Sequence, residues 1–429
     1  MGFQRQIILL LIVFALSGIS LAQTVQKVSP SEADRIKLDD LRARGYEALY
    51  SLDYETANRL FREMVRLFPD HPAGPQCLAA TLWVQELNRS RHRQASLYST
   101  ESFYTSEDKA DPHLVEQFRL WTRTAKLLAE ARLRRNPRDV EALYFLGVTE
   151  GLKAVFAAAV ERRFMAAFGD GWRAVDLHRE VLKLDPDYHD AELTIGMYDY
   201  IVGSLPLPIK MLASIGGARG SKKRGLETLE RVARDGHWAR GIARLLLIDL
   251  YKREKRWTEA LATARELAAQ YPHNYLFQLQ AADALVARAA TLRKTKGASA
   301  AAASADQDEA FRIFESLLQD RTTASGSGRA VATDLIHFRY GEALLTAGQP
   351  QRANEQFQAA ARQAGGEPGL MTLARLRAAQ SMDLAGRRTE ALAEYRAVLE
   401  RPKFQQSHEV ARRGLSKPYR IPDQDWPKY

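Results

Sequence analysis

Cysteine is almost absent from this 429-residue chain, which contains Cys77 and no other. One cysteine cannot form an internal disulfide, and it cannot build a metal or redox centre together with a second thiol. Cys77 lies in an apolar helical pattern, so we predict that it is a small core residue. The stability of the fold must then come from packing rather than from cross-links.

Catalytic motifs are also missing. The nine histidines form no H-E-x-x-H, and no G-x-S-x-G occurs. The glycine-rich and basic run 216–225 lacks the spacing of a phosphate loop, G-x-x-x-x-G-K-[ST]. The segment 178–190 contains histidines and aspartates, but they fall at a packing position and in a turn, where turn chemistry accounts for them. We therefore expect no enzyme activity, no cofactor and no metal.

A long apolar run occurs in this sequence only near the N-terminus. Arg5 precedes the apolar run 7–16, and small residues flank a cleavage position at Ala22. This pattern predicts a signal peptide, 1–22, that is removed near Ala22 to give an exported, periplasmic or extracellular protein. The alternative is an uncleaved N-terminal anchor, although the run is short against the about 20 residues of a membrane span.

Sustained polar–apolar alternation, the pattern of a strand, is absent, and a helical spacing recurs in its place. Four times an alanine is followed 12 residues later by a proline, and ten residues beyond each proline stands a small residue. A small residue lets two helices approach closely, and a proline ends the helix. The pairs are Ala57 and Pro69, Ala125 and Pro137, Ala174 and Pro186, and Ala260 and Pro272, with Gly147 and Gly196 among the small residues that follow.

This pattern resembles the tetratricopeptide repeat. The segment 41–69 is the best match, with Gly45, Ala57, Phe61 and Pro69 in the register of the family. Further units contain Gly341, Ala353 and Ala391, so that about eight helix pairs cover 39–400. The resemblance implies an all-α, right-handed α-solenoid of helix-turn-helix repeats, with a concave groove that binds peptides or protein segments.

Composition divides the chain into six segments. Proline- and glycine-rich stretches and charge runs set the boundaries. We predict a signal peptide (1–22), a flexible lead-in (23–38), N-terminal repeats with insertions (39–200), an apolar and basic insertion (201–225), C-terminal repeats (226–401) and an extended proline-rich tail (402–429). The Ala- and Ser-rich stretch 297–308 is predicted to be a mobile loop.

Three successive units have expanded connections between their two helices. The small residue of the first helix should precede the alanine of the second by 12, but the intervals are 46, 27 and 29. Equivalent loops of a solenoid emerge on one edge, where insertions often build a binding face. The second expansion is apolar and predicts a helix that continues from 141 to about 168. In the third, Pro206 and Pro208 predict an irregular segment.

The third expansion holds the candidate ligand-binding residues, which are apolar side chains beside a glycine-rich basic turn. They are Leu207, Ile209, Met211, Lys210, Arg219, Lys222, Lys223 and Arg224. Such a combination suits lipid headgroups or an amphipathic anion. The alternative is a local core, formed by the second and third expansions, with a solvated basic helix start capped by Ser221.

The positive charge of the chain is regional. The formal net charge is +10, and the window 210–256 contains 13 basic and five acidic residues. A regional excess favours a local anionic contact over general nucleic-acid binding. The leading hypothesis is a non-catalytic adaptor that binds a protein or peptide partner in the cell envelope. The alternative is contact with a lipid, an amphipathic anion or a membrane surface through 155–224.

Overall fold

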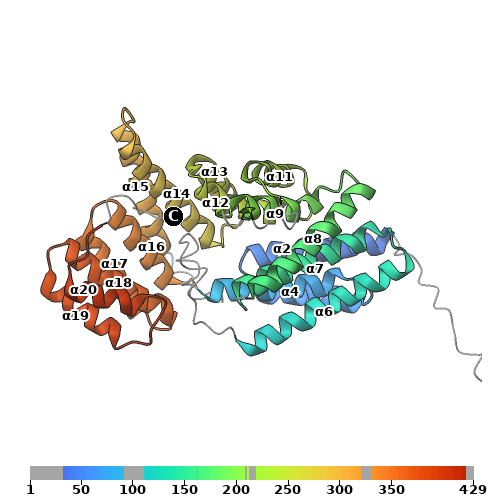
Figure 1. Ribbon diagram of the computed structural model, residues 1–429, viewed down its shortest axis with the longest axis horizontal. Helices are drawn as coiled ribbons and strands as arrows, with labels where there is room; N and C mark the ends of the chain where they lie inside the picture. The colour runs from blue at the N-terminus through green and yellow to red at the C-terminus, as the bar shows by residue number, and fades with distance from the viewer. Residues whose placement is uncertain are drawn as a thin grey trace, which may run out of the picture.

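A computed structural model describes residues 32–90, 111–161, 163–207, 210–211, 219–319 and 331–421 (Figure 1). These residues form helices joined by turns, without a strand. Eight consecutive helix pairs and a closing helix follow one another along the chain. They are α2 (Glu32–Tyr50) with α3 (Tyr54–Leu67), α4 (Ala73–Arg89) with α6 (Pro112–Arg135), α7 (Val140–Ala159) with α8 (Phe164–Leu184), α9 (Glu192–Ser204) with α11 (Lys222–Asp235), α12 (Arg240–Arg253) with α13 (Trp257–Gln270), α14 (Tyr275–Lys294) with α15 (Ala300–Gln319), α16 (Thr333–Thr346) with α17 (Pro350–Arg362), α18 (Pro368–Leu384) with α19 (Arg388–Leu399), and α20 (Ser407–Ser416); a 3-10 turn, η2 (His189–Ala191), precedes α9.

The architecture is a right-handed α-solenoid, as the sequence predicted. Each helix packs against the next one along the chain, so every pair buries an apolar stripe against its neighbours. Figure 1 shows helices α2 to α8 gathered at one end and α16 to α20 at the other, with α9 to α14 between them.

Small residues lie at the crossing of the two helices of a pair. The alanine of the second helix is fully buried in seven of the pairs, at Ala57, Ala125, Ala174, Ala260, Ala310, Ala353 and Ala391. Gly45 and Gly341 face the rings of Phe61 and Phe357, and a Cβ atom added to either glycine would lie 2.2 or 2.6 Å from a ring carbon. The close approach of the two helices therefore depends on glycine at these positions.

Each of the four signature prolines follows directly on a helix end. Helices α3, α6, α8 and α13 end two residues before Pro69, Pro137, Pro186 and Pro272, respectively. In all four cases the residue between helix and proline donates its amide to a carbonyl of the last turn. The distance from the Asp185 amide to the Val181 carbonyl, for example, is 2.8 Å. This geometry reflects the missing N–H of proline and the restriction that it places on the residue before it.

The second expanded connection differs from its prediction. Instead of one helix to about residue 168, α7 ends at Ala159 and α8 begins at Phe164, so the extra residues lengthen two antiparallel helices. Ala154 and Gly171 face each other across this hairpin, where a Cβ atom on Gly171 would lie 3.7 Å from that of Ala154. Small side chains on both helices let them stay in contact over the added turns.

The third expansion also begins differently, because the amide of Lys210 donates to the carbonyl of Pro206 at 2.9 Å, which is a helical turn. Pro206 precedes Leu207, the first helical residue, and its carbonyl accepts the first helical hydrogen bond, so its missing N–H interrupts no bond of this turn. Most of the first expansion, 91–110, lies outside the described residues.

Three further predictions about segments were wrong. The stretch 297–308 is not a loop after residue 299, because α15 starts at Ala300 and its alanines are the best helix formers. The tail is not extended throughout, because α20 occupies 407–416 and packs Gly414 against the ring of Tyr395. The array also starts within the predicted lead-in, at Glu32. The signal peptide 1–22 and the end of the tail, 422–429, lie outside the described residues.

Residues of α2 contact residues of the third, fifth and sixth pairs. The guanidinium carbon of Arg42 lies 5.0 Å from the centre of the Phe145 ring on α7 and 4.3 Å from that of Trp238, just before α12. The carbonyl of Tyr50 accepts a hydrogen bond of 2.7 Å from the side chain of Asn274, which caps α14. The space between α2, α7 and α12 is therefore filled by side chains of α2.

A buried carboxylate joins the fourth and fifth pairs. Asp190, in η2, is 5% exposed and accepts hydrogen bonds of 2.8 to 3.0 Å from three successive backbone amides, those of His237, Trp238 and Ala239. These amides lie directly before α12, and that of Ala239, the N-cap residue, is one of the unpaired N–H groups at the positive dipole end of the helix. Asp190 therefore fixes where α12 begins relative to α9.

Helix α7 is, among the described residues, the one helix long and apolar enough to cross a membrane, although none was predicted beyond the N-terminus. Because 56% of its apolar window is buried inside the protein, its composition is that of a core helix.

Candidate binding surfaces

The basic residues of the third expansion are held by carboxylates of neighbouring helices. The guanidinium of Arg224 binds both oxygens of Asp199 on α9, with the Nη2 to Oδ1 distance at 2.7 Å, and Asp199 is almost fully buried. The ammonium of Lys222 binds Glu254 at 2.8 Å. Ser221 accepts from the amide of Arg224 and caps α11, as the alternative interpretation predicts.

The regional charge excess is reduced by acidic residues from outside the window. Arg231 binds Glu192 at 2.7 Å, Arg244 binds Glu266 at 3.0 Å, and Arg256 binds Glu259 at 2.8 Å. A count along the sequence cannot include these partners, because the repeat brings them in from adjacent helices. Ion pairing in the folded protein therefore reduces the basic region to a few exposed cations, and Arg219 and Lys223 are among them.

The apolar part of the predicted set is exposed where it is described. Leu207 is 76% and Met211 is 65% exposed, whereas Ile209 lies outside the described residues. Lys210, between them in the chain, directs its ammonium to the carbonyl of Gly203 at 3.4 Å. These side chains do not form a closed local core among the described residues, so the two interpretations of the third expansion each account for a part of it.

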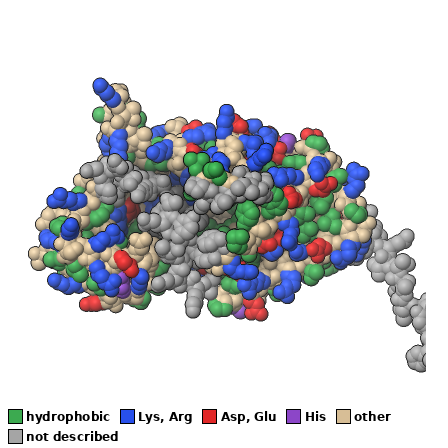
Figure 2. Space-filling model, in the orientation of Figure 1, with side chains coloured by type: hydrophobic (Ala, Val, Ile, Leu, Met, Phe, Trp, Pro, Cys, Tyr) green, Lys and Arg blue, Asp and Glu red, His purple; other side chains and the backbone are tan. Residues whose placement is uncertain are grey.

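Exposed large apolar side chains are concentrated in the expanded units. Eight of the eleven among the described residues lie between residues 120 and 211, and Ile421 is the one example after residue 219. Figure 2 shows hydrophobic side chains gathered over the part of the surface formed by α8 and α9. The eight are Leu120, Leu127, Val155, Met165, Phe168, Ile201, Leu207 and Met211. A concentration of this kind marks interaction surfaces.

Part of this apolar surface follows the line where α7, α8 and α9 meet. All three helices meet at Gly151, whose added Cβ atom would lie 3.8 Å from both Ala174 on α8 and Thr194 on α9. One helical turn nearer the hairpin tip, the Trp172 and Tyr198 rings meet edge to face with centroids 5.8 Å apart, and Phe168 follows 6.4 Å from Trp172. We call Val155, Phe168, Trp172, Tyr198 and Ile201 the apolar seam. Val155, Phe168 and Ile201 are each about half exposed.

The inner side chains of the C-terminal pairs form ion pairs in a row. Asp283 on α14 lies 3.6 Å from Lys252 on α12 and 3.2 Å from Arg339 on α16, and all three are less than 10% exposed. Arg377 on α18 binds Glu342 on α16 through two hydrogen bonds. These charges are used in holding successive helices together.

Cys77 and His178, which were not expected to be catalytic, are buried. Burial raises the pKa of the Cys77 thiol above its ordinary value and lowers the pKa of His178 to about 4. His178 occupies the position of Phe61 in its pair, against Gly147, and its Nε2 lies 3.1 Å from the carbonyl of Tyr144. Among the described residues, no three histidine, cysteine or acidic side chains converge in a way that could hold a metal.

A tetratricopeptide repeat model matches residues 243–274, from α12 through α13. No curated protein matches the chain in sequence. Among solved structures, the human IFIT1 dimer with m7Gppp-AAAA is 12% identical, with 91% of this chain and 86% of that chain covered at a TM-score of 0.45. Yeast Tom70 is 11% identical, with 90% and 88% covered at 0.39. A tetratricopeptide protein of Thermus thermophilus is 17% identical, with 58% and 99% covered at 0.32. Likeness at this level identifies no ligand.

Proposed function

The chain is a tetratricopeptide repeat protein, and from that premise we propose that it is an exported, non-catalytic scaffold that binds a protein or peptide partner in the cell envelope. Proteins of this family are typically scaffolds with protein partners. The proposed binding surface is the apolar seam. The observation that carries the proposal is the concentration of exposed apolar side chains in 120–211, against a single one in the described part of the chain after 219.

The apolar seam suits a partner segment better than the inner face near α2 does. Arg42 is 5% exposed and is enclosed by Phe145 and Trp238, so a peptide in that place would have to displace α2. The seam instead presents Phe168 and Ile201 to solvent from two helices that cross close together. Binding energy at protein interfaces is concentrated in such aromatic and aliphatic anchors, which a partner covers with its own apolar side chains.

Capture from envelope extract tests the partner proposal. The mature chain and a Phe168→Gln, Ile201→Gln variant are compared by quantitative mass spectrometry. Ile36→Gln on α2 is the matched control, since Ile36 is also well exposed, at 62%, but belongs to none of the three helices of the seam. We expect a partner that the wild type and the control retain and the seam variant loses at least tenfold. Equal retention by all three proteins would remove the seam as the binding surface.

Export is part of the proposal and has its own test. The apolar run 7–16 after Arg5, with small residues up to Ala22, supports it. The mature N-terminus of the protein from cell fractions should begin after Ala22, in the fraction outside the cytoplasmic membrane. A full-length N-terminus in the membrane fraction would favour the uncleaved anchor.

A second candidate, contact with a lipid surface through 155–224, is favoured by the exposure of Leu207 and Met211, which flank Lys210 in the chain, and of the cation Arg219. The cations to change are Arg219 and Lys223, because Lys222 and Arg224 hold structural ion pairs. The wild type should bind vesicles of phosphatidylglycerol, and the variant Leu207→Gln, Met211→Gln should not bind them. The variant Arg219→Glu, Lys223→Glu should bind more weakly than the wild type, with the largest difference at low salt. Sedimentation with vesicles that leaves the wild type in the supernatant would exclude this candidate.

A further inference from the structure

A cleft of about 420 Å³ lies between α6 and the hairpin of α7 and α8. Its volume falls within the range of small-molecule sites. The stacked rings of Phe118 and Phe156, with centroids 3.7 Å apart, form its apolar wall and are themselves buried. Thr122 uses its hydroxyl for the helix backbone, since it donates to the carbonyl of Phe118 at 2.9 Å. The chemistry of the cleft is therefore set by its charged side chains.

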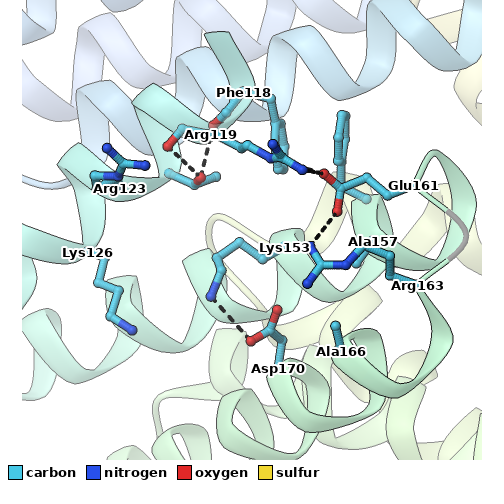
Figure 3. A pocket seen from close by; sticks show the side chains of 12 residues that line it. Phe118, Arg119, Arg123, Lys126, Lys153, Ala157, Glu161, Arg163, Ala166 and Asp170 are labelled. Atoms are coloured by element: carbon cyan, nitrogen blue, oxygen red, sulfur yellow. Dashed lines mark hydrogen bonds and ion pairs between the residues drawn. The ribbon is translucent and has the colours of Figure 1, made fainter. Parts of the chain in front are cut away.

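Basic side chains from three segments line this cleft. They are Arg119, Arg123 and Lys126 on α6, Lys153 on α7 and Arg163 at the hairpin tip, against two acidic lining residues, Glu161 and Asp170. Figure 3 shows Arg119, Arg123, Lys126, Lys153 and Arg163 placed around the opening, with the carboxylates of Glu161 and Asp170 between them. The lining thus carries five cations for two anions.

The carboxylates do not neutralise this set. Glu150, fully buried below the cleft, binds Lys126 at 2.8 Å and also binds Lys153, and Arg173 lies 3.5 Å away. Burial alone would raise the pKa of Glu150, but hydrogen bonds from the two lysines outweigh burial and hold the pKa below its ordinary value. Glu161 binds both Arg119 and Arg163. Asp170 binds Lys153 at 3.2 Å, and Glu130 lies 3.8 Å from Lys126. Six cations, with Arg123 and Arg173 among them, therefore face four carboxylates, and a net positive charge remains.

Arg123 is the lining cation of this cleft that no acidic side chain among the described residues neutralises. It is exposed, and it forms no ion pair with any residue in the described part of the chain. Its guanidinium presents a planar set of donors that matches the oxygens of phosphate. Lys126 lies three residues further along α6, on the same face, and adds donors from a second direction.

We propose that this cleft binds a small molecule through a phosphate group, held by Arg123, Lys126 and Lys153. The phosphate compensates the excess of cations over carboxylates, with Arg123 as the lining cation that has no ion pair among the described residues, and the volume beyond one phosphate accepts an organic group against the wall of Phe118 and Phe156. A free phosphate ester and the headgroup of a phospholipid have this chemistry in common. The site is independent of the apolar seam, because α8 directs Ala166 and Asp170 into the cleft and Phe168 away from it.

Binding is tested on the mature chain with two kinds of probe. Inorganic pyrophosphate and glycerol 3-phosphate are titrated by calorimetry and by thermal shift, and vesicles of phosphatidylglycerol are compared with vesicles of phosphatidylcholine by sedimentation. We expect a soluble probe at a hundredfold excess over its Kd to raise Tm by about 3 °C. The affinity should fall as the salt concentration rises.

A charge-reversed pair of variants separates this cleft from general basicity. Arg123→Glu changes the cleft, and Arg134→Glu makes the same change on an exposed arginine of the same helix, outside the cleft lining. Neither arginine has an ion pair among the described residues, so both variants should keep the circular dichroism spectrum and Tm of the wild type. Arg123→Glu should weaken binding at least tenfold, and Arg134→Glu by less than twofold.

Each outcome decides the proposal. Binding of soluble esters that Arg123→Glu abolishes supports the site and identifies a free phosphate ester as its ligand. Binding of phosphatidylglycerol vesicles alone, with the same dependence on Arg123, supports the site and identifies a lipid headgroup. Absence of binding in both arms, or equal losses in the two variants, overturns the proposal. The seam variant Phe168→Gln, Ile201→Gln should bind every probe as the wild type does, so failure of one proposal leaves the other standing.

Discussion

The region before α12 contains the three expanded helices α6, α7 and α8, whereas the region from α12 onward contains the short pairs α12 with α13 and α16 with α17, besides α14 and α15 with 20 residues each. Helices α6, α7 and α8 have 24, 20 and 21 residues, whereas α12, α13, α16 and α17 have 13 or 14. The added turns extend past the crossing to places without a neighbouring pair, and there Phe168 and Met165 stay exposed. The repeat signature therefore fixes where two helices cross, and the length of each helix beyond the crossing determines the surface that is available for ligands.

The joint between the two regions should give the largest effect. Asp190→Ala removes the acceptor of three backbone hydrogen bonds at the start of α12 and should lower the free energy of unfolding by about 3–5 kcal/mol. In urea, the variant should unfold in two separated transitions, followed by circular dichroism. Asp187→Ala, at an exposed position of the same turn, is the control. A single transition at the midpoint of the wild type would show that Asp190 does not join the regions.

Acid should loosen the N-terminal region first. His178 has a pKa lowered to about 4 by burial, against 6.5 in the unfolded chain, so the unfolded state binds more protons between these values. The stability present above pH 6.5 is therefore lost as the pH falls, by about 3 kcal/mol at pH 4.

Two variants check this dependence by urea denaturation at pH 7.5 and pH 4. His178→Phe should reduce the loss between these values by about 3 kcal/mol, and the remaining loss belongs to paired carboxyls such as Glu141, whose pKa is lowered. Phenylalanine fits this position, because Phe61 and Phe357 occupy it in other pairs. Phe357→His should transfer an acid-sensitive step to the C-terminal region. The idea fails if His178→Phe leaves the pH dependence of the wild type unchanged.

Glycine at the crossing should matter equally in both regions. Gly45→Ala and Gly341→Ala each place a Cβ atom against a buried aromatic ring and should lower the free energy of unfolding by about 1–3 kcal/mol. Gly169→Ala is the control in α8, since nothing lies within 4 Å of its Cβ position, and it should be neutral or stabilising by about 0.5–1 kcal/mol. Thermal and urea unfolding measure these differences. A clear difference between Gly45→Ala and Gly341→Ala would mean that the two crossings are not equivalent.

The exposed apolar residues should have the smallest effect on stability. Met165 is 85% exposed, so Met165→Gln should change the free energy of unfolding by less than about 0.5 kcal/mol. Leu344→Gln, at a fully buried position of α16, supplies the contrast, with a loss of at least about 3 kcal/mol. If Met165→Gln destabilises the protein to a similar extent, the surface near the hairpin tip is part of the core.

The repeat itself could be predicted from the sequence because its determinants are local. Ala57 and Pro69 belong to one helix and its end, and the same spacing at Ala125, Ala174 and Ala260 repeats one packing problem. The helix at 300–319 was also within reach, since its alanines favour a helix, but the serines among them were interpreted as a loop.

The charged surfaces could not be predicted, because they depend on partners far apart in the chain. Arg224 meets Asp199 from another helix, and Glu150 on α7 binds Lys126 across the interface with α6. Sequence analysis therefore selected Lys222 and Arg224 as ligand residues and missed Arg123. A usable signal was present in the length of α6, since a helix of 24 residues extends beyond the crossing that the repeat requires.

The contact of Tyr50 with Asn274 has a consequence for the order in which the chain folds during its synthesis. The two residues are 224 positions apart, so a ribosome that adds 5–20 residues each second needs about 11–45 s to go from one to the other. Throughout that interval Tyr50 lacks the ring of Tyr271 and the side chain of Asn274, which it contacts in the folded protein. A chaperone that shields the nascent N-terminal segment for this period would therefore raise the yield of the folded protein.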